Sequence, residues 1–405
     1  MISTITNIKS IFTWDPMKDQ INKITGKNIV IDNGIIQEIC ETIPDHSKKI
    51  DAKGSCITPG FIDCHTHPVF LKDRSNEFNM RISGKSYQDI ENAGGGIKST
   101  VFDVQNANYE QLYEKTLENI ESLFLNGSTS IEAKSGYGLT LDDEIKSLRV
   151  LKDINQNTCI DIFPTFMGAH AFPRGFENKR DKYIDMICDE MIPKVAEEKL
   201  AIYCDVFCEN GYFTVEQSRK ILETGLKYGL LPRLHADEFM DSGAAELAAE
   251  IGAISADHLM NVSNRGIKKL AGSNVIATLL PGTTLFLGQD KYANGKKMIE
   301  NGIEIALATD FNPGSSTIKS LPTIMFLGCL YCGLSIEKAF KAVTYSSAKA
   351  VNSEEKIGLI KKKYKADLIF WNIENINEIP YWFSSERIIS IMKDGKITSN
   401  IKNQK

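Results

Sequence analysis

The chain alternates short apolar stretches with longer amphipathic ones, and this alternation is what most restricts its possible folds. Eight short stretches rich in apolar and β-branched residues have the length of strands, and each ends in polar residues. They span residues 57–67, 128–134, 160–170, 202–210, 231–238, 253–259, 275–282 and 303–312. Strands that alternate with helical segments form βα units around a parallel sheet. The pattern therefore predicts an α/β fold, a (β/α)8 barrel of the TIM type.

The segments between these strands have a helical period. In residues 109–127, leucine and isoleucine recur near every third or fourth position, and Gly127 follows the last of them. Glycine commonly ends a helix because it adopts the left-handed conformation at no steric cost. We therefore expect a helix that stops at Gly127.

The two ends of the chain follow a different pattern. Residues 1–57 and 358–405 contain short strands with alternating polarity, separated by turn signals. Asn33-Gly34 and Asp394-Gly395 are each flanked by such strands, which indicates two hairpins. We expect the ends to form one small β-sandwich-like module, with the barrel in residues 58–357.

Composition limits the partners that this chain can have. Its 405 residues, 42% hydrophobic and 24% charged, suit an ordinary globular protein, and its net charge of −5 comes without a basic stripe. We therefore expect no nucleic-acid partner. The first thirty residues lack a signal-peptide pattern and no apolar run reaches membrane-spanning length, so we expect a cytoplasmic protein with no membrane contact.

The nine cysteines form an odd set without the spacing of a disulfide framework. They are therefore interpreted as buried thiols in a reducing compartment. Cys204 and Cys208, and the CxxC pair Cys329 and Cys332, could also suggest a metal or redox site. No second CxxC accompanies them, which favours core packing.

Histidines are concentrated at the predicted strand ends. His65 and His67 lie two residues apart on the first strand, so their side chains share one face and can meet one ion. An HxH pair also arises by chance, and two hydrogen-bonded histidines at a barrel rim are the alternative. Further polar residues end other strands, namely His170, His235, His258 and Asp310.

These positions predict a metal site. The C-terminal strand ends of such a barrel converge, so two histidines, a third histidine and a carboxylate can bind one ion and leave a position for water. Water bound in this way becomes a nucleophile near neutral pH. Asp310 has an alternative role as the N-cap of a helix beginning near Ser315.

Longer motifs resemble a known family. PGFIDCHTH at 59–67, with a later histidine and a strand-ending aspartate, resembles the amidohydrolases. The further segments together resemble the imidazolonepropionase family along nearly the whole chain. They are RSNEF (74–78), AGGGIKST (93–100), EAKSGYGL (132–139), GAHAFP (168–173), HADEF (235–239), SADHL (255–259), LLPG (279–282) and TDFNPGSS (309–316).

The resemblance implies a particular site. It implies hydrolysis of imidazolone propionate to formiminoglutamate in histidine degradation, with one divalent metal, zinc or iron, and a homodimer. The implied ligands are His65, His67, His235 and Asp310. Binuclear relatives carry a carboxylated lysine on the fourth strand, but that strand ends here in Cys208, Glu209 and Asn210, which favours one metal. Lys134 on the second strand is interpreted as structural.

The resemblance also implies the residues that contact substrate. They are Arg74, Tyr137, His170, Glu238, Asn312, Gly314 and Ser315. Arg74 suits the propionate carboxylate, with a rim ion pair to Glu77 as its alternative. Tyr137 lies between two glycines and could equally serve packing. The Gly94–Gly96 run lacks a phosphate-binding motif after it and is expected to form a lid or tight turn.

The implied mechanism assigns three further roles. His170 would help to stabilise the oxyanion, while Glu238 would carry a proton to the leaving nitrogen. His258 and Asp310 would hold the attacking water. The general base could be Glu238, His258 or Asp310, and the sequence does not choose among them. The alternatives are a deaminase or another cyclic amidase, and a metal-storing or imidazole-binding protein without turnover. KSGYG, GAHA and Arg74 argue against the first, Glu238 and His258 against the second.

Overall fold

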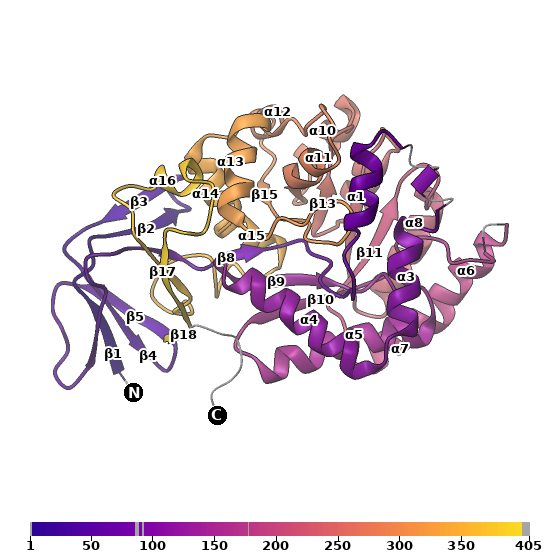
Figure 1. Ribbon diagram of the computed structural model, residues 1–405. Coiled ribbons are helices and arrows are strands. Elements are labelled where there is room, and N and C mark those ends of the chain that lie inside the picture. The colour runs from indigo at the N-terminus through magenta and orange to yellow at the C-terminus, as the bar shows by residue number, and fades with distance from the viewer. Residues whose placement is uncertain (1, 86–88, 91–92, 177, 399–405) are drawn as a thin grey trace.

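A computed structural model describes residues 2–85, 89–90, 93–176 and 178–398, and it contains the expected barrel (Figure 1). Eight parallel strands pair in chain order. They are β8 (Phe61–Asp63), β9 (Ser128–Lys134), β10 (Asp161–Ala169), β11 (Tyr203–Cys208), β12 (Leu231–Ala236), β13 (Ser255–His258), β14 (Ile276–Leu279) and β15 (Ile305–Leu307). The circle closes where Thr66, beyond β8, pairs in parallel with Phe311, beyond β15.

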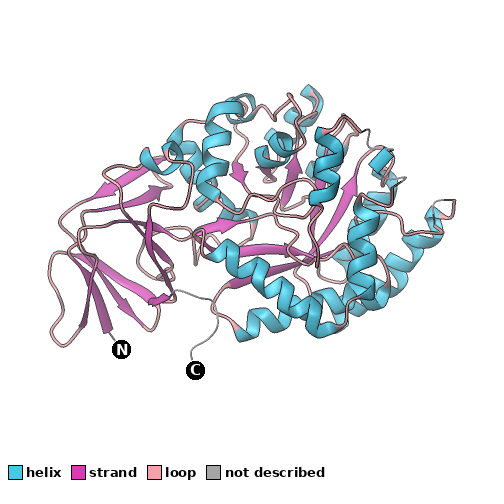
Figure 2. Ribbon diagram, viewed as in Figure 1, coloured by secondary structure: helices cyan, strands magenta, loops and turns pink. Residues whose placement is uncertain are grey.

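Helices lie around the outside of this barrel (Figure 2). They are α1 (Ser75–Ile82), α3 (Ile97–Asn106), α4 (Tyr109–Phe124), α5 (Leu141–Asn157), α6 (Arg180–Met186), a π-helix (Ile187–Met191), α7 (Ile192–Glu197), α8 (Val215–Lys227), α9 (Ala244–Ile251), α10 (Asn264–Ala271), α11 (Pro281–Phe286), α12 (Gly295–Glu300), α13 (Leu321–Tyr331), α14 (Ile336–Ala342) and α15 (Tyr345–Ala350). Among the described helices, none is long and apolar enough to cross a membrane.

Helix α4 confirms the helical prediction for residues 109–127. Asn108 and Gln111 form a reciprocal capping box at its start, which satisfies backbone donors that a helix leaves unpaired. The helix ends at Phe124, and Gly127 adopts a φ of +100°, a conformation that disfavours residues with a Cβ. The leucine and isoleucine face packs on the barrel, so α4 buries the apolar stripe that the sequence shows.

The chain ends form mixed sheets beside the barrel. One sheet has the order β5–β4–β1–β6 and the other β18–β17–β16–β7–β2–β3. Their strands are β1 (Ile2–Thr6), β2 (Ser10–Asp15), β3 (Gln20–Ile24), β4 (Asn28–Asp32), β5 (Ile35–Cys40), β6 (Lys48–Asp51), β7 (Cys56–Pro59), β16 (Leu368–Trp371), β17 (Ile388–Lys393) and β18 (Lys396–Thr398), and the short helix α16 (Glu378–Tyr381) lies between β16 and β17. Both expected hairpins form, at Asn33-Gly34 and Asp394-Gly395.

The first predicted strand is wrong as a single strand over residues 57–67. It divides at Gly60 into β7, which pairs with β16 and β2, and β8, which begins the barrel. A Cβ at Gly60 would lie 2.2 Å from Oγ1 of Thr129, so only glycine fits this crossing. His65 and His67 consequently lie beyond β8, in the segment that closes the barrel. The domain limit between residues 57 and 58 stays a prediction.

An ion-pair cluster joins the terminal module to the barrel. Asp161, the first residue of β10, accepts hydrogen bonds from Nζ of Lys365 at 2.7 and 2.8 Å and from Nζ of Lys393 at 3.1 Å. Lys393 also contacts the Asp367 carboxylate at 3.0 and 3.1 Å, and its side chain is fully buried. Asp161 therefore holds both C-terminal lysines against the end of the barrel where the strands begin, and Asp367 binds Lys393 from within the terminal module.

Candidate active site

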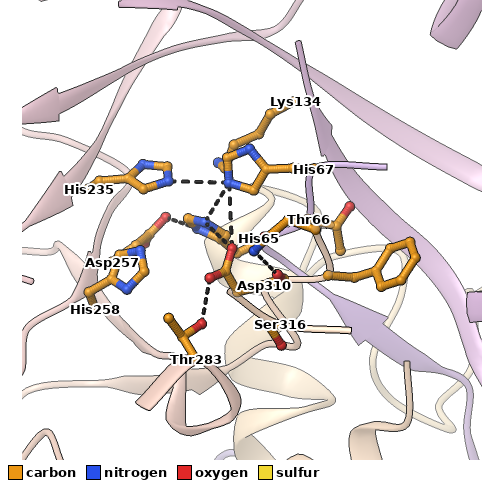
Figure 3. A network of polar contacts seen from close by, with 12 residues as sticks. His65, Thr66, His67, Lys134, His235, Asp257, His258, Thr283, Asp310 and Ser316 are labelled. Carbon is orange, nitrogen blue, oxygen red and sulfur yellow. Dashed lines mark hydrogen bonds and ion pairs between the residues drawn. The ribbon is translucent and has the colours of Figure 1, made fainter. Parts of the chain in front are cut away.

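The chemically active side chains gather at the other end of the barrel, where the strands end (Figure 3). His65 and His67 follow β8, His170 follows β10, and Asp310 follows β15. His235 lies within β12 and His258 is the last residue of β13. Five of these six residues are buried and His170 is partly exposed, so the predicted convergence of strand ends occurs in the described structure.

Four atoms of this group point at one another. The Nε2 atom of His67 lies 3.3 Å from Nε2 of His65 and 3.3 Å from Nε2 of His235. Oδ1 of Asp310 lies 3.6 Å from Nε2 of His65 and 3.5 Å from Nε2 of His67. Ligands about 2.1 Å from a tetrahedral ion are about 3.4 Å apart, so the spacing of His65, His67 and Asp310 suits a metal ion between them, with His235 at a similar distance from His67.

Two buried aspartates orient two of these histidines. Nδ1 of His65 donates to Oδ2 of Asp257 at 2.6 Å, and Nδ1 of His235 donates to Oδ1 of Asp205 at 3.1 Å. Each histidine therefore has its proton on Nδ1 and presents the lone pair of Nε2 to the centre. Aspartate behind a metal-bound histidine is a frequent arrangement, because it fixes both the tautomer and the ring orientation.

Burial favours the neutral form of three histidines in the cluster. It lowers the pKa of His65, His67 and His258 well below the usual value, and neighbouring positive charge adds to the effect. The Nε2 atoms of His65 and His235 present lone pairs toward His67 and Asp310. Such a group needs a cation, so the cluster has the composition and geometry of a metal site.

Asp310 is held in place by a threonine. Its Oδ2 accepts a hydrogen bond from Oγ1 of Thr283 at 2.5 Å, which leaves Oδ1 facing the histidines. Burial raises the pKa of Asp310 to about 6, and a bound cation would act in the opposite direction. The alternative role as a helix N-cap is excluded, because the next helix, α13, begins at Leu321 and is capped by Ser320.

Glu238 and His258 lie beside the cluster. Oε2 of Glu238 is 3.6 Å from Nε2 of His258, and both side chains are buried. The turn that carries Glu238 is fixed by Glu209, whose Oε2 accepts the backbone N–H of Phe239 at 2.8 Å. Burial raises the pKa of Glu238 well above the usual range, with Asp310 and Glu209 adding to the shift. A raised pKa brings a carboxyl group closer to neutral pH, where it can both accept and release a proton.

A cavity of about 390 Å³ opens from this cluster to the surface. Every residue that the sequence placed in the site lines it, except His65, which lies beneath His67. These lining residues are His67, Arg74, Tyr137, His170, His235, Glu238, His258, Asp310, Asn312, Gly314 and Ser315. The volume suits a small molecule, so metal cluster and substrate contacts belong to one pocket.

Arg74 lies flat against Gly314 in this cavity. A Cβ on residue 314 would fall 1.3 Å from Nη2 of Arg74, so any larger residue would displace the guanidinium. The predicted alternative is also present, since Nη1 of Arg74 lies 3.6 Å from Oε2 of Glu77. Nε of Arg74 is buried without a hydrogen-bond partner, which leaves a donor for a ligand carboxylate.

His170 and Tyr137 form one wall of the cavity. The His170 ring stacks on His67 with centroids 5.1 Å apart and lies 5.2 Å from the Tyr137 ring. Nδ1 of His170 donates to the carbonyl oxygen of Gly136 at 3.0 Å, and burial lowers the pKa of His170 to about 3. Its Nε2 is therefore a hydrogen-bond acceptor that faces the cavity.

Asn312, which was expected to contact substrate, forms its hydrogen bonds within its own turn. Its Oδ1 accepts the backbone N–H groups of Gly314 and Ser315 at 2.8 and 2.7 Å, and its Nδ2 donates to the carbonyl of Asp310 at 2.6 Å. The side chain thus shapes the turn that carries Asp310 and Gly314. Ser315 lines the cavity beside it. Gly94 and Gly96 form a tight turn with positive φ, and Gly96 also lines the cavity.

Several contributors were missed at the level of sequence. Asp205, Asp257, Glu132 and Arg233 are fully buried beneath the histidines, and Glu77, Arg81, Phe207 and Tyr212 line the cavity. The sequence could have indicated the first four, because each is a charged residue within a predicted barrel strand. Glu132 lies two positions before Lys134 and Arg233 two positions before His235, so each pair shares one face of its strand. Cys204, Cys208 and Cys332 are buried and Cys329 is partly buried, as core packing requires. The possible metal-binding groups among the described residues contain no cysteine.

The comparisons with known proteins first define the class. The model of the Amidohydrolase family matches residues 189–398. Among solved structures, Escherichia coli guanine deaminase aligns with a TM-score of 0.73 over 99% of both chains at 14% identity. A 5-methylcytosine deaminase from Klebsiella pneumoniae aligns with a TM-score of 0.73 over 98% of both chains at 18% identity. These identities establish the fold alone, and with the family match they make the protein an amidohydrolase.

Curated relatives then identify the family. The imidazolonepropionase of Brevibacillus brevis is 44% identical over 94% of this chain and 91% of its own length. That of Clostridium tetani is 44% identical over 94% of this chain and 92% of its own, and that of Shouchella clausii 46% over 86% and 78%. The chain belongs to the imidazolonepropionase family.

Proposed function

We propose that this protein hydrolyses 4-imidazolone-5-propanoate to N-formimino-L-glutamate, with water activated by one divalent ion. The observation that carries this proposal is the position of Arg74 and the histidine cluster at two parts of one cavity of about 390 Å³. A substrate with a carboxylate on a short chain and a cyclic amide at the other end can contact both. The family relationship supports the same substrate.

The proposed ligands are His65, His67, His235 and Asp310. The network connected to these histidines contains four carboxylates, Glu132, Asp205, Asp257 and Asp310, and two cations, Lys134 and Arg233. Four negative and two positive groups leave a formal excess of two negative charges, which one divalent ion balances. Imidazole and carboxylate ligands suit zinc or iron equally. Lys134 already pairs with two carboxylates, which supports one metal without a bridging lysine.

When bound, the ion polarises the ring carbonyl and lowers the pKa of water. Among the chain's own groups, Glu238 is proposed to carry the proton from water to the leaving ring nitrogen, because it is buried, has a raised pKa and lines the cavity. His258, 3.6 Å from Glu238, and Asp310 are proposed to orient the attacking water. Arg74 binds the propionate and Tyr137 lies against the ring.

The role proposed for His170 differs from the expectation of an oxyanion donor. Because its Nδ1–H is donated to the Gly136 carbonyl and the ring is neutral, Nε2 offers a lone pair to the cavity. A lone pair accepts a hydrogen bond and does not stabilise a negative oxygen. We therefore propose that His170 accepts an N–H of the substrate ring and so fixes which carbonyl faces the metal site.

The test is to mix the purified protein with imidazolone propionate and follow loss of the ring's ultraviolet absorbance, with and without a chelator. We expect absorbance loss that the chelator abolishes and that added zinc or iron restores, without release of ammonia. Ammonia release would instead support a deaminase, and binding of substrate without absorbance loss would support a binding protein. The family resemblance also supports a homodimer, for which light scattering should give twice the mass of one chain.

A further inference from the structure

Lys134 has a position that the proposed reaction does not use. Its side chain is fully buried inside the barrel, and its Nζ lies 2.8 Å from Oε1 of Glu132 and 2.8 Å from Oδ2 of Asp205. Burial works against a charge here, but Asp205 and Glu132 outweigh it and hold the pKa of Lys134 above its usual value. A buried charge is costly unless it is paired, so this lysine has a specific task.

The contacts of Lys134 continue to the metal cluster. Asp205 uses Oδ2 for Lys134 and Oδ1 for Nδ1 of His235, which lies 3.1 Å away. Nε2 of His235 then lies 3.3 Å from Nε2 of His67. Because each Asp205 oxygen has its own partner, Lys134 fixes the rotation of this carboxylate and thereby the plane of the His235 ring.

The other oriented histidine has separate supports. Asp257 receives Nδ1–H of His65 at 2.6 Å and lies 3.4 Å from Nη2 of Arg233. The same guanidinium donates to the carbonyl of Cys64 at 2.8 Å, on the N-terminal side of His65. Loss of Lys134 would therefore act on the metal site mainly through Asp205 and His235. A second route runs through Glu132, whose Oε2 accepts the backbone N–H of Thr66 at 3.2 Å.

We propose that Lys134 is a positioning residue of the metal centre, which raises the affinity of the site for a divalent ion by holding Asp205 against His235. This inference rests on the proposed function, because it presumes that the cluster binds a metal. It assigns no contact between Lys134 and the ion. The simpler alternative is that Lys134 only stabilises the barrel.

Lys393 provides a matched control for that alternative. It is also a fully buried lysine between two carboxylates, Asp367 and Asp161, but it lies where the barrel meets the terminal module. Removing either lysine takes a positively charged partner from a buried carboxylate, so both substitutions should destabilise the fold. Only the loss of Lys134 should change the metal site.

The experiment compares Lys134→Met and Lys393→Met with the unmodified full-length protein. Chelator competition measures the dissociation constant for zinc, the visible spectrum of the cobalt-loaded protein reports ligand geometry, and urea unfolding of the metal-free proteins reports stability. We expect Lys134→Met to bind zinc about 10- to 100-fold more weakly, with an altered cobalt spectrum. Lys393→Met should bind zinc normally. Equal zinc affinity of the two folded variants would overturn the inference.

A second pair of variants covers the case in which Lys134→Met does not fold. Asp205→Asn keeps the shape of the residue and Lys134 itself, and Asp367→Asn is its counterpart beside Lys393. Weaker zinc binding by Asp205→Asn alone supports the inference, and equal binding by both overturns it. If the unmodified protein binds neither zinc nor iron, the proposed function fails and the inference with it. If the unmodified protein binds zinc normally and neither Lys134→Met nor Asp205→Asn weakens that binding, the inference about Lys134 is wrong while the proposed function stands.

Discussion

A buried lysine lies between carboxylates at each end of the barrel, one from the barrel itself and one from the terminal module. At the closed end, where the strands begin, Lys393 pairs with Asp161 and Asp367. At the open end, where the strands finish, Lys134 pairs with Glu132 and Asp205. Both lysines are fully buried and both are paired with carboxylates, although Lys393 also lies 3.3 Å from Asp394, so the main difference between the ends lies in what surrounds each cluster.

At the closed end, no side-chain atom of the described ion-pair cluster lacks a partner. At the open end, five buried atoms of the site and of the network beneath it have none among the described residues. They are Nδ1 of His67, Nδ1 of His258, Oδ1 of Asp257, Nε of Arg74 and Nε of Arg233. Unpaired buried polar atoms cost free energy, so the open end gives up stability that the ion-pair cluster at the closed end retains. The cluster at the closed end thus serves stability, while the open end carries the proposed metal ligands and the cavity that Arg74 lines.

The largest effect should follow removal of a proposed ligand. Without His67 the cluster loses the nitrogen that lies 3.3 Å from both His65 and His235, so the site should no longer retain its ion. We expect His67→Ala to lower turnover at least about 10³-fold, because metal activation of water contributes several kcal/mol. Metal analysis and the absorbance assay check this.

His46 supplies the control, since it is an exposed histidine in the terminal module. His46→Ala should keep full metal content and turnover. If His67→Ala also kept both, the open end would not be the metal site and the contrast between the two ends would fail.

Replacing the proposed proton carrier should have the next largest effect. Glu238→Gln keeps the size of the side chain but cannot exchange a proton, so we expect turnover to fall about 10²- to 10⁴-fold. Metal content should remain full, because Glu238 is not a proposed ligand. Full metal content with near-normal turnover would remove Glu238 from the proton path. Metal content and turnover together distinguish a proton carrier such as Glu238 from a metal ligand such as His67, whose loss should lower both.

The sequence predicts most of the fold because strand signals are local. Apolar β-branched runs locate all eight barrel strands, and the Asn-Gly and Asp-Gly turns locate both hairpins. The division between β7 and β8 could not be predicted in this way. Its cause is the approach of Thr129 to Gly60, two residues far apart in sequence, and no local pattern reports such a contact.

The candidate site likewise has features that the sequence predicts and features that it does not. Strand-end positions and family motifs indicate which residues face the cavity, and the structure brings them together. The pairing of His65 with Asp257 and of His235 with Asp205 depends on the position of distant strands, which a single sequence does not give. The tautomer of His170 likewise depends on the Gly136 carbonyl, a backbone atom without a sequence signal.

A smaller effect is expected where the open end meets the substrate carboxylate. Arg74→Ala removes charge-assisted hydrogen bonds worth about 1.5–3 kcal/mol, so we expect KM to rise about 10- to 100-fold. Turnover at saturation should change less, because Arg74 lies away from the metal cluster. Steady-state kinetics with imidazolone propionate measure both constants. An unchanged KM would show that the carboxylate binds elsewhere in the cavity.

The closed end should affect stability and leave the chemistry intact, and its pH dependence should show this. Burial would raise the pKa of Asp161, but Lys393 and Lys365 outweigh it and hold that pKa below the usual value. A lowered folded-state pKa stabilises the fold above the unfolded pKa of about 3.9, and this contribution is lost as pH falls through the folded value. We therefore expect Asp161→Asn to reduce the free energy of unfolding at pH 7, with a difference from the unmodified protein that shrinks below about pH 4. Urea unfolding across this range, with kcat/KM measured at pH 7, checks both parts. A loss of activity in the folded variant would mean that the closed end also acts on the site.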